Sequence, residues 1–133
     1  MKPLLQFNQI AMEKIFKKFA DPEKCPVRNV LDRLGDKWSV LIILILGEAG
    51  SLRFKQLQKA IGNVSQKMLT ITLKSLEADG IISRHVFAEV PLRVEYRLTE
   101  RGESLLPLIK QLSDWASKNM KQIVKDRKSY AVE

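Results

Sequence analysis

The sequence contains few of the residues that bind metals or form disulfides. It has one cysteine, Cys25, and one histidine, His85, in 133 residues. Structural zinc sites take several cysteine or histidine ligands and a disulfide takes a pair of cysteines, so we expect neither. His85 lies in a strand-like run without an identifiable nucleophile or orienting group, which argues against a catalytic triad. A single cysteine suits a reducing compartment.

Glycine-rich loops and long apolar runs are also missing. The six glycines stand singly at the expected ends of elements, so the sequence has no phosphate-binding loop. Without such a loop, a metal site or a triad, we expect neither an enzyme nor a cofactor. The longest apolar run, Val40–Leu46, is far shorter than the roughly 20 residues that span a bilayer. The start Met1-Lys2-Pro3 does not resemble a secretory signal, so we expect a cytoplasmic protein without a membrane partner.

Acidic residues are outnumbered by basic ones. There are 15 Asp and Glu against 23 Lys and Arg, which gives a formal net charge of +8. On a small chain this surplus points first to nucleic acid and second to an anionic membrane, with a merely solvated basic surface as the alternative. The length suits one compact domain with a helix or two left for assembly.

The periodicity of apolar residues predicts a mainly α-helical chain with a small β-hairpin. Six helices are predicted, over Leu4–Ala20, Val27–Leu34, Lys37–Leu46, Arg53–Ile61, Ser65–Asp79 and Thr99–Val124. The two predicted strands, Ile81–Phe87 and Val94–Leu98, lie between the last two helices. Asp36, Ser51 and Ser65 are expected to cap the helices that follow them, and Gly80 to end one. The tail Lys125–Glu133 is expected to fray.

Two helices joined by a tight turn, with a hairpin directly after the second, follow the order of a winged helix-turn-helix. We therefore expect an N-terminal helix over 1–24 that contributes to dimerisation. A winged helix-turn-helix DNA-binding domain is expected over 25–98. A C-terminal dimerisation helix and tail are expected over 99–133.

The segment Ser65–Asp79 has two different sides. At 100° per residue, one side gathers Leu69, Thr72, Leu73 and Leu76, with Met68 beside them. The opposite side carries Gln66, Lys67, Thr70, Ile71 and Lys74. A recognition helix needs this division, because its apolar side packs on the domain while polar and basic side chains reach the major groove. An ordinary amphipathic surface helix is the alternative.

The outward residues suit different contacts with double-stranded DNA. Gln66 can address an adenine or a phosphate, Thr70 a base edge, and Ile71 a thymine methyl group. Lys67 and Lys74 can neutralise phosphates or donate to guanine.

Further DNA contacts are expected around this helix. Its N-terminus, capped by Ser65, attracts a backbone phosphate. We also assign Arg53, at the start of the preceding helix, and Arg84, in the hairpin, to the DNA-binding set. Arg93 at the wing tip suits a narrow minor groove or flanking phosphates. The alternative for Arg93 is an ion pair with Glu89 or Glu95.

Several runs of residues stand in a register that is found in one family. They are Cys25-Pro26-Val27, Leu34-Gly35-Asp36-Lys37-Trp38, Arg53-Phe54, Val64-Ser65-Gln66-Lys67-Met68-Leu69-Thr70, Leu76-Glu77-Ala78-Asp79-Gly80, Arg93-Val94-Glu95-Tyr96 and Leu98-Thr99 with Gly102. Over about Cys25 to Trp115 the chain resembles the HxlR-type helix-turn-helix regulators, relatives of the MarR regulators. The resemblance implies a dimeric DNA-binding repressor or activator that often responds to oxidants, electrophiles or small molecules. It also implies a groove-reading role for the Ser65 helix and a wing role for the hairpin.

The last predicted helix carries a long apolar stripe that one small core cannot cover, which predicts a homodimer. The stripe consists of Leu105, Leu108, Ile109, Leu112 and Trp115. The first helix is expected to join the same surface with Phe7, Ile15 and Phe19. Alternatively, both helices fold back within one monomer.

Cys25 precedes Pro26 and the start of a helix, with Lys24 and Arg28 close in sequence. Helix N-termini and cations favour the reactive thiolate, and the resemblance implies a redox-sensing cysteine here. A small apolar residue packed at an interface is the alternative. For the whole protein, the alternative to a regulator is a winged-helix module that binds an acidic protein partner.

Overall fold

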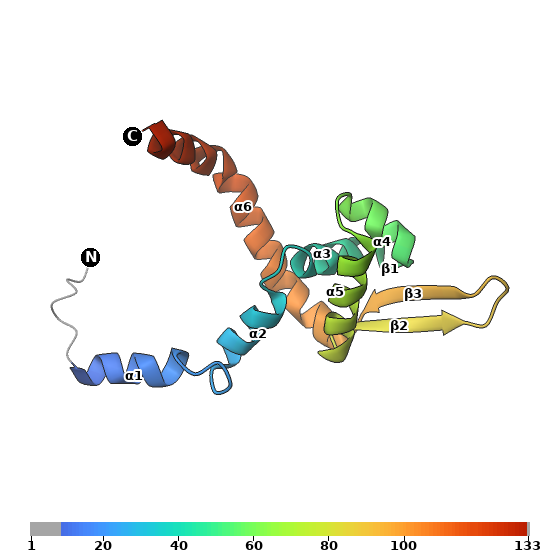
Figure 1. The fold of residues 1–133 in the computed structure, drawn as a ribbon, viewed down its shortest axis with the longest axis horizontal. Helices are drawn as coiled ribbons and strands as arrows, with labels where there is room; N and C mark the ends of the chain where they lie inside the picture. The colour runs from blue at the N-terminus through green and yellow to red at the C-terminus, as the bar shows by residue number, and fades with distance from the viewer. Residues whose placement is uncertain (1–8, 133) are drawn as a thin grey trace. The chain divides into compact units, whose positions relative to one another are not determined.

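The structure is a computed structural model that describes residues 9–132 and divides into two compact units, Met1–Asp36 and Lys37–Glu133 (Figure 1). The first unit contains helices α1 (Gln9–Phe19) and α2 (Pro26–Leu34). The second contains, in chain order, α3 (Ser39–Ala49), β1 (Ser51–Leu52), α4 (Phe54–Ile61), α5 (Gln66–Ala78), β2 (Ile82–Phe87), β3 (Arg93–Leu98) and α6 (Glu100–Val132). None of the helices in the described part of the chain has both the length and the apolar character of a membrane span.

Helix α3 forms the centre of the second unit. It is apolar on nearly all sides, and Ile42, Ile43 and Leu46 are completely or almost completely buried. The helix contacts α4, α5, α6 and β3, so every layer of the unit packs on it. Leu57 of α4 and Leu73 of α5 enter the same core. A helix without a polar side has to be surrounded, as the sequence predicts.

The start of α3 differs from the prediction. The residues before it form a turn, the helix begins at Ser39, and the N-cap position falls to Trp38 instead of Asp36. The predicted cap at Asp36 is therefore wrong, because the chain needs one more turn before the apolar helix can enter the core. The helix also continues past Leu46 to Ala49 and ends at Gly50 with φ of 81°, a left-handed value that glycine tolerates.

A third strand joins the hairpin. Strand β1 pairs antiparallel with β3, matching Ser51 with Arg97 and Leu52 with Tyr96, so the sheet has the order β1-β3-β2. The predicted cap at Ser51 is wrong, since this residue belongs to β1. The N-cap of α4 is Arg53 instead. A two-residue strand is too short to show an alternating pattern, which explains why periodicity missed it.

The predicted hairpin is confirmed. Strands β2 and β3 pair in one register from Ile82 with Leu98 to Phe87 with Arg93, and the hairpin extends away from the helices (Figure 1). At its base, a Cβ on Gly102 would overlap the carbonyl oxygen of Ile81, so the chain can cross here only with glycine.

Helix α6 is longer than predicted. It runs without a break to Val132 and includes Pro107, so the expected fraying from Lys125 onward is wrong for the described residues. No glycine or proline follows Pro107 in the sequence, and an i,i+4 hydrogen bond from Gln122 Nε2 to Asp126 Oδ1 of 2.9 Å supports the last turns.

Candidate DNA interface

Helix α5 presents the two sides that its periodicity predicts. Its inward side chains Leu69, Thr72, Leu73 and Leu76 are all buried. The Thr72 hydroxyl is satisfied because it donates to the carbonyl of Met68 at 2.8 Å. On the opposite side Gln66, Lys67, Ile71 and Lys74 are exposed and Thr70 is half-buried. Met68, expected beside the apolar side, is 40% exposed.

The start of α5 carries a side-chain cap and no acidic residue. Ser65 is the N-cap, as predicted, and its hydroxyl accepts a hydrogen bond from the Met68 N–H at 3.1 Å. The other first-turn N–H groups have no partner inside the helix, and the first turn contains no acidic residue. A phosphate oxygen suits both the free donors and the positive end of the helix dipole.

Thr70 offers less than its residue type suggests. Its hydroxyl donates to the carbonyl of Gln66 at 2.8 Å, so the hydrogen is already used. What remains for a neighbouring molecule is the oxygen as an acceptor and the methyl group. Beside it, Ile71 is 50% exposed and provides an apolar contact.

An open cleft of about 380 Å³ separates α5 from the hairpin. Its lining combines Phe54, Thr70, Leu73, Lys74, Glu77, Arg84 and Tyr96. Lys74 and Arg84 are both exposed and lie on opposite elements at this cleft, so it brings together two residues that the sequence assigned to DNA contact.

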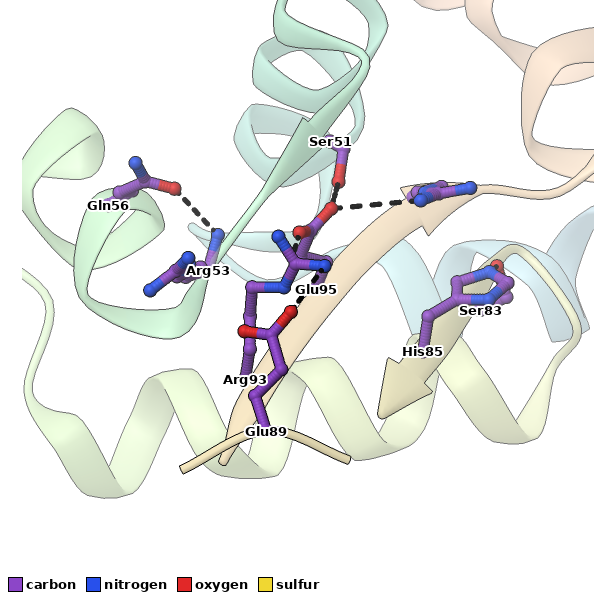
Figure 2. Close-up of polar contacts among 9 residues, drawn as sticks. Ser51, Arg53, Gln56, Ser83, His85, Glu89, Arg93 and Glu95 are labelled. Atoms are coloured by element: carbon purple, nitrogen blue, oxygen red, sulfur yellow. Dashed lines mark hydrogen bonds and ion pairs between the residues drawn. The ribbon is translucent and has the colours of Figure 1, made fainter. Parts of the chain in front are cut away.

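Arg93 is held inside the wing. Its Nη2 lies 3.1 Å from Glu89 Oε1, and its Nε lies 3.4 Å from Glu95 Oε2 in an ion pair without hydrogen-bond geometry (Figure 2). The guanidinium also stacks 4.0 Å from the centre of the Phe87 ring, its cross-strand neighbour. The sequence left open an ion pair of Arg93 with Glu89 or Glu95, and the structure contains both ion pairs. Arg93 begins β3 and does not stand at the wing tip.

Glu95 lies at the centre of the same network. It accepts a hydrogen bond of 2.6 Å from the Ser51 hydroxyl and lies 3.7 Å from Arg97 Nη2 (Figure 2). The pKa of Glu95 is lowered, mainly by the Ser51 hydrogen bond and also by Arg93 and Arg97, against an opposing effect of desolvation. This carboxylate therefore joins β1 to β3 and fixes the arginines. The signal that could have revealed it is the two-residue spacing of Arg93, Glu95 and Arg97, which places them on one face of a strand.

Two further basic residues of the predicted set are exposed. Arg84 lies in β2 opposite Tyr96. Arg53 lies at the start of α4, where its backbone N–H donates to Gln56 Oε1 at 2.9 Å and its charge contributes to the lowered pKa of Glu95. Both guanidinium groups face solvent near the wing.

The residues assigned to dimerisation divide into groups. On α6, Leu108, Leu112 and Trp115 are exposed, whereas Leu105 is half-buried. Ile109 is only 6% exposed within the single chain, so it belongs to the core and not to the exposed stripe. On α1, the exposed side chains include Ile15 and Phe19, while Phe7 lies outside the described residues.

Cys25 occupies the N-cap position of α2, directly before Pro26, and is 2% exposed. The Arg28 guanidinium donates to the carbonyl oxygens of Phe19 and Ala20, at 3.3 and 2.7 Å, so it serves the end of α1. Across residues 9–132, no group of His, Cys, Asp and Glu side chains is arranged to hold a metal ion.

Comparison with known proteins agrees with this geometry. The model of the HxlR-like helix-turn-helix family matches residues 33–124. The chain is 42% identical over 105 residues to the HTH-type transcriptional regulator YdeP of Bacillus subtilis, covering 79% of this chain and 81% of YdeP.

Two solved structures are similar as well. The redox regulator HypR in its reduced form is 37% identical with a TM-score of 0.71, covering 75% of this chain and 98% of HypR. The reduced form of the regulator YodB from B. subtilis is 39% identical with a TM-score of 0.62, covering 71% and 92%. The fold and these relatives define a winged helix-turn-helix transcriptional regulator, a DNA-binding protein and not an enzyme. Within that class, the chain belongs to the HxlR-like helix-turn-helix family.

Proposed function

We propose that the protein is a homodimeric regulator that reads a double-stranded DNA operator with the outward side of α5 and holds the flanking backbone with its wing. The observation that supports this most is the division of α5, whose inward leucines are buried while Lys67, Lys74 and Gln66 face solvent. The formal net charge of +8 adds the long-range attraction that DNA-binding proteins use.

Each outward residue of α5 has a role that follows from its chemistry. Gln66 and Thr70 address base edges, and Ile71 packs on a thymine methyl group. Lys67 and Lys74 bind phosphates, together with the N-terminus capped by Ser65. Arg84, across the cleft, and Arg53, at the start of α4, add two further cations beside these lysines.

The exposed apolar stripe of α6 supports the homodimer. Leu108, Leu112 and Trp115 are each more than half exposed, and a second copy of the chain can cover them. Ile15 and Phe19 of α1 contribute in the same way. A two-fold dimer would bind two half-sites about 34 Å apart, one turn of DNA. We place this activity in the cytoplasm, consistent with the single, unpaired cysteine.

The finer proposal is that an oxidant or electrophile regulates DNA affinity through Cys25. Cys25 precedes a helix, and among the similar structures HypR is named a redox regulator. An oxidant reaches the buried thiol only when the packing around it opens, and the polar bulk added by oxidation then opposes repacking, which provides a physical route to a change in DNA affinity. In the alternative proposal, Cys25 only packs in the core and a small molecule is the effector.

Selection of bound duplexes from a random DNA pool tests the operator proposal. Lys67→Ala should weaken binding to every sequence, whereas Gln66→Ala and Thr70→Ala should relax the preference at particular base pairs. Lys125→Ala removes an exposed charge far along α6 and serves as the matched control. It should change neither the overall affinity for DNA nor the preference at any base pair. Equal losses on selected and random DNA for all three α5 variants would show that the helix does not read bases. Binding to acidic proteins without any DNA selection would favour the protein-interaction module.

For the cysteine, binding of the selected duplex is measured with and without diamide. Wild-type protein should lose or gain affinity after treatment, and Cys25→Ser should not respond. If Cys25→Ser and wild-type respond alike, the thiol is not the sensor.

A further inference from the structure

The end of the wing is apolar. Val90 is fully exposed at 102%, Leu92 is 64% exposed, and Val86, just before the connecting loop, is 50% exposed. These three side chains are named the aliphatic tip. Arg93 is the only basic residue from Val86 to Glu95, and its guanidinium is held by two carboxylates. The part of the wing that reaches farthest therefore presents aliphatic surface beside the ion-paired Glu89, and no available cation.

The register of the hairpin relates Val86, the one residue of the aliphatic tip that lies in a strand, to the cleft beside α5. Directly opposed residues of two strands share a face, so Val86 with Val94 and Arg84 with Tyr96 lie on the same face of the hairpin. Arg84 and Tyr96 line the cleft that Thr70 and Lys74 of α5 also line. The same face thus changes from cationic beside α5 to aliphatic farther out, while the ion pairs of Arg93 occupy the other face.

The hairpin extends beyond the helices (Figure 1). A DNA duplex that lies along the outward side of α5 and continues past the hairpin would therefore also contact the aliphatic tip. For a duplex with α5 in a major groove, the surface next to it along the axis is a minor groove. That groove is only about 6 Å wide, which excludes a helix and admits a narrow loop. Aliphatic side chains enter minor grooves as wedges that partly unstack a base step and bend the duplex.

We propose that Val90 and Leu92 form such a wedge, inserted from the minor groove beside the half-site that α5 reads. This inference rests on the proposed function and goes beyond it, because it assigns specificity to a part of the wing that makes no polar contact with bases. Flexible pyrimidine–purine steps unstack most easily, so the protein selects such a step at a fixed distance from the positions read by α5. The phosphates on either side of the wedge are held by Arg84 and by Lys67 and Lys74 of α5.

The test compares three full-length proteins: wild type, Val90→Ser with Leu92→Ser, and the exchange Val90→Leu with Leu92→Val. The exchange keeps the composition and apolar character of the tip and so is the matched control. Both residues are exposed, so the serine variant should unfold at the same temperature as wild type. Each protein is used to select duplexes from one random pool. Each is then titrated with the duplex most enriched by wild type, carrying a donor and an acceptor dye at its ends.

Wild type and the exchange variant should enrich two features, the base pairs read by α5 and a flexible step beside them. Both should shorten the distance between the dyes. The serine variant should keep the first feature and lose the second, leave the duplex straight, and bind it at least about tenfold more weakly, as expected when two aliphatic side chains are no longer buried.

Other outcomes overturn the proposal in distinguishable ways. If wild type enriches a sequence and the serine variant matches it in enrichment, bending and affinity, there is no wedge, and the operator proposal stands. If wild type enriches nothing, both proposals are wrong. Sedimentation identifies a different occupant: a change in assembly caused by the serine variant would show that the aliphatic tip contacts a second copy of the chain.

Discussion

Helix α5 and the β2–β3 hairpin both carry basic residues, but they use them in different ways. On α5, Lys67 and Lys74 are exposed, and no acidic residue occupies the first turn. In the hairpin, Arg93 and Arg97 lie against Glu95, and Arg93 also against Glu89. The lysines of α5 are therefore available to an external anion, as is Arg84 of the hairpin, whereas the doubly paired Arg93 mainly stabilises the hairpin itself. A count of basic residues alone would have treated the two regions as equivalent.

The largest expected effect concerns the buried side of α5. Leu73→Ala should lower the free energy of unfolding by about 2–5 kcal/mol, because it leaves a cavity among fully buried neighbours. Ile71→Ala, on the exposed side two residues away, should change it by less than about 0.5 kcal/mol. Urea unfolding of both variants measures the difference. Similar losses for the two would mean that α5 does not have one buried and one exposed side.

The second prediction compares a free and a paired cation. Lys67→Ala should reduce the slope of log affinity against log salt for a mixed DNA duplex by about one, the value for one lost phosphate contact. Arg93→Ala should leave the slope unchanged and instead lower the unfolding temperature, because Glu89 loses its ion-pair partner and Glu95 keeps only Ser51 and Arg97. A reduced slope for Arg93→Ala would place this arginine on the DNA.

The third prediction concerns the cap of α5. Ser65→Ala should destabilise the protein by about 1 kcal/mol, because the Met68 N–H loses its acceptor. Ser117→Ala, at an exposed site on α6, controls for the loss of a hydroxyl group. Thermal unfolding followed by circular dichroism gives both values. An unchanged midpoint for Ser65→Ala would mean that the cap contributes nothing to α5.

The smallest expected effect is the pH dependence that comes from Glu95. Because its pKa in the folded protein lies below the ordinary value of 4.5, its contribution is complete above that value. The contribution is lost as the pH falls through the lowered pKa of the folded state. The stability difference between wild type and Glu95→Gln should accordingly shrink as the pH is lowered from 7 toward 3 in urea titrations. A difference that is constant with pH would mean that the Glu95 charge does not stabilise the wing.

The features that could be predicted from sequence are those governed by residues close together in the chain. The buried side of α5, its Ser65 cap and the hairpin follow from local periodicity and local chemistry, and all are observed. The two-residue strand β1 and the ion pairs of Arg93 depend on which strands meet and in what register. Local spacing offered the Arg93 ion pair only as an alternative and gave no sign of β1.

The prediction that Ile109 belongs to the exposed stripe of α6 was wrong for a related reason. Ile109 and Leu108 share the apolar stripe, yet one is buried and the other exposed, because only part of the stripe meets the core of its own chain. Periodicity shows that a helix has an apolar side. It does not show which turns of that side already have a partner.

The unbroken course of α6 has a consequence for operator geometry. Its 33 residues correspond to about 50 Å at 1.5 Å per residue, and no glycine or proline follows Pro107 within them. In the proposed homodimer such a stiff connection would hold the two reading helices at one separation and one rotational phase. Inserting about five base pairs between the half-sites, half a turn of the duplex, would then turn one of them away from its reader and abolish two-site binding.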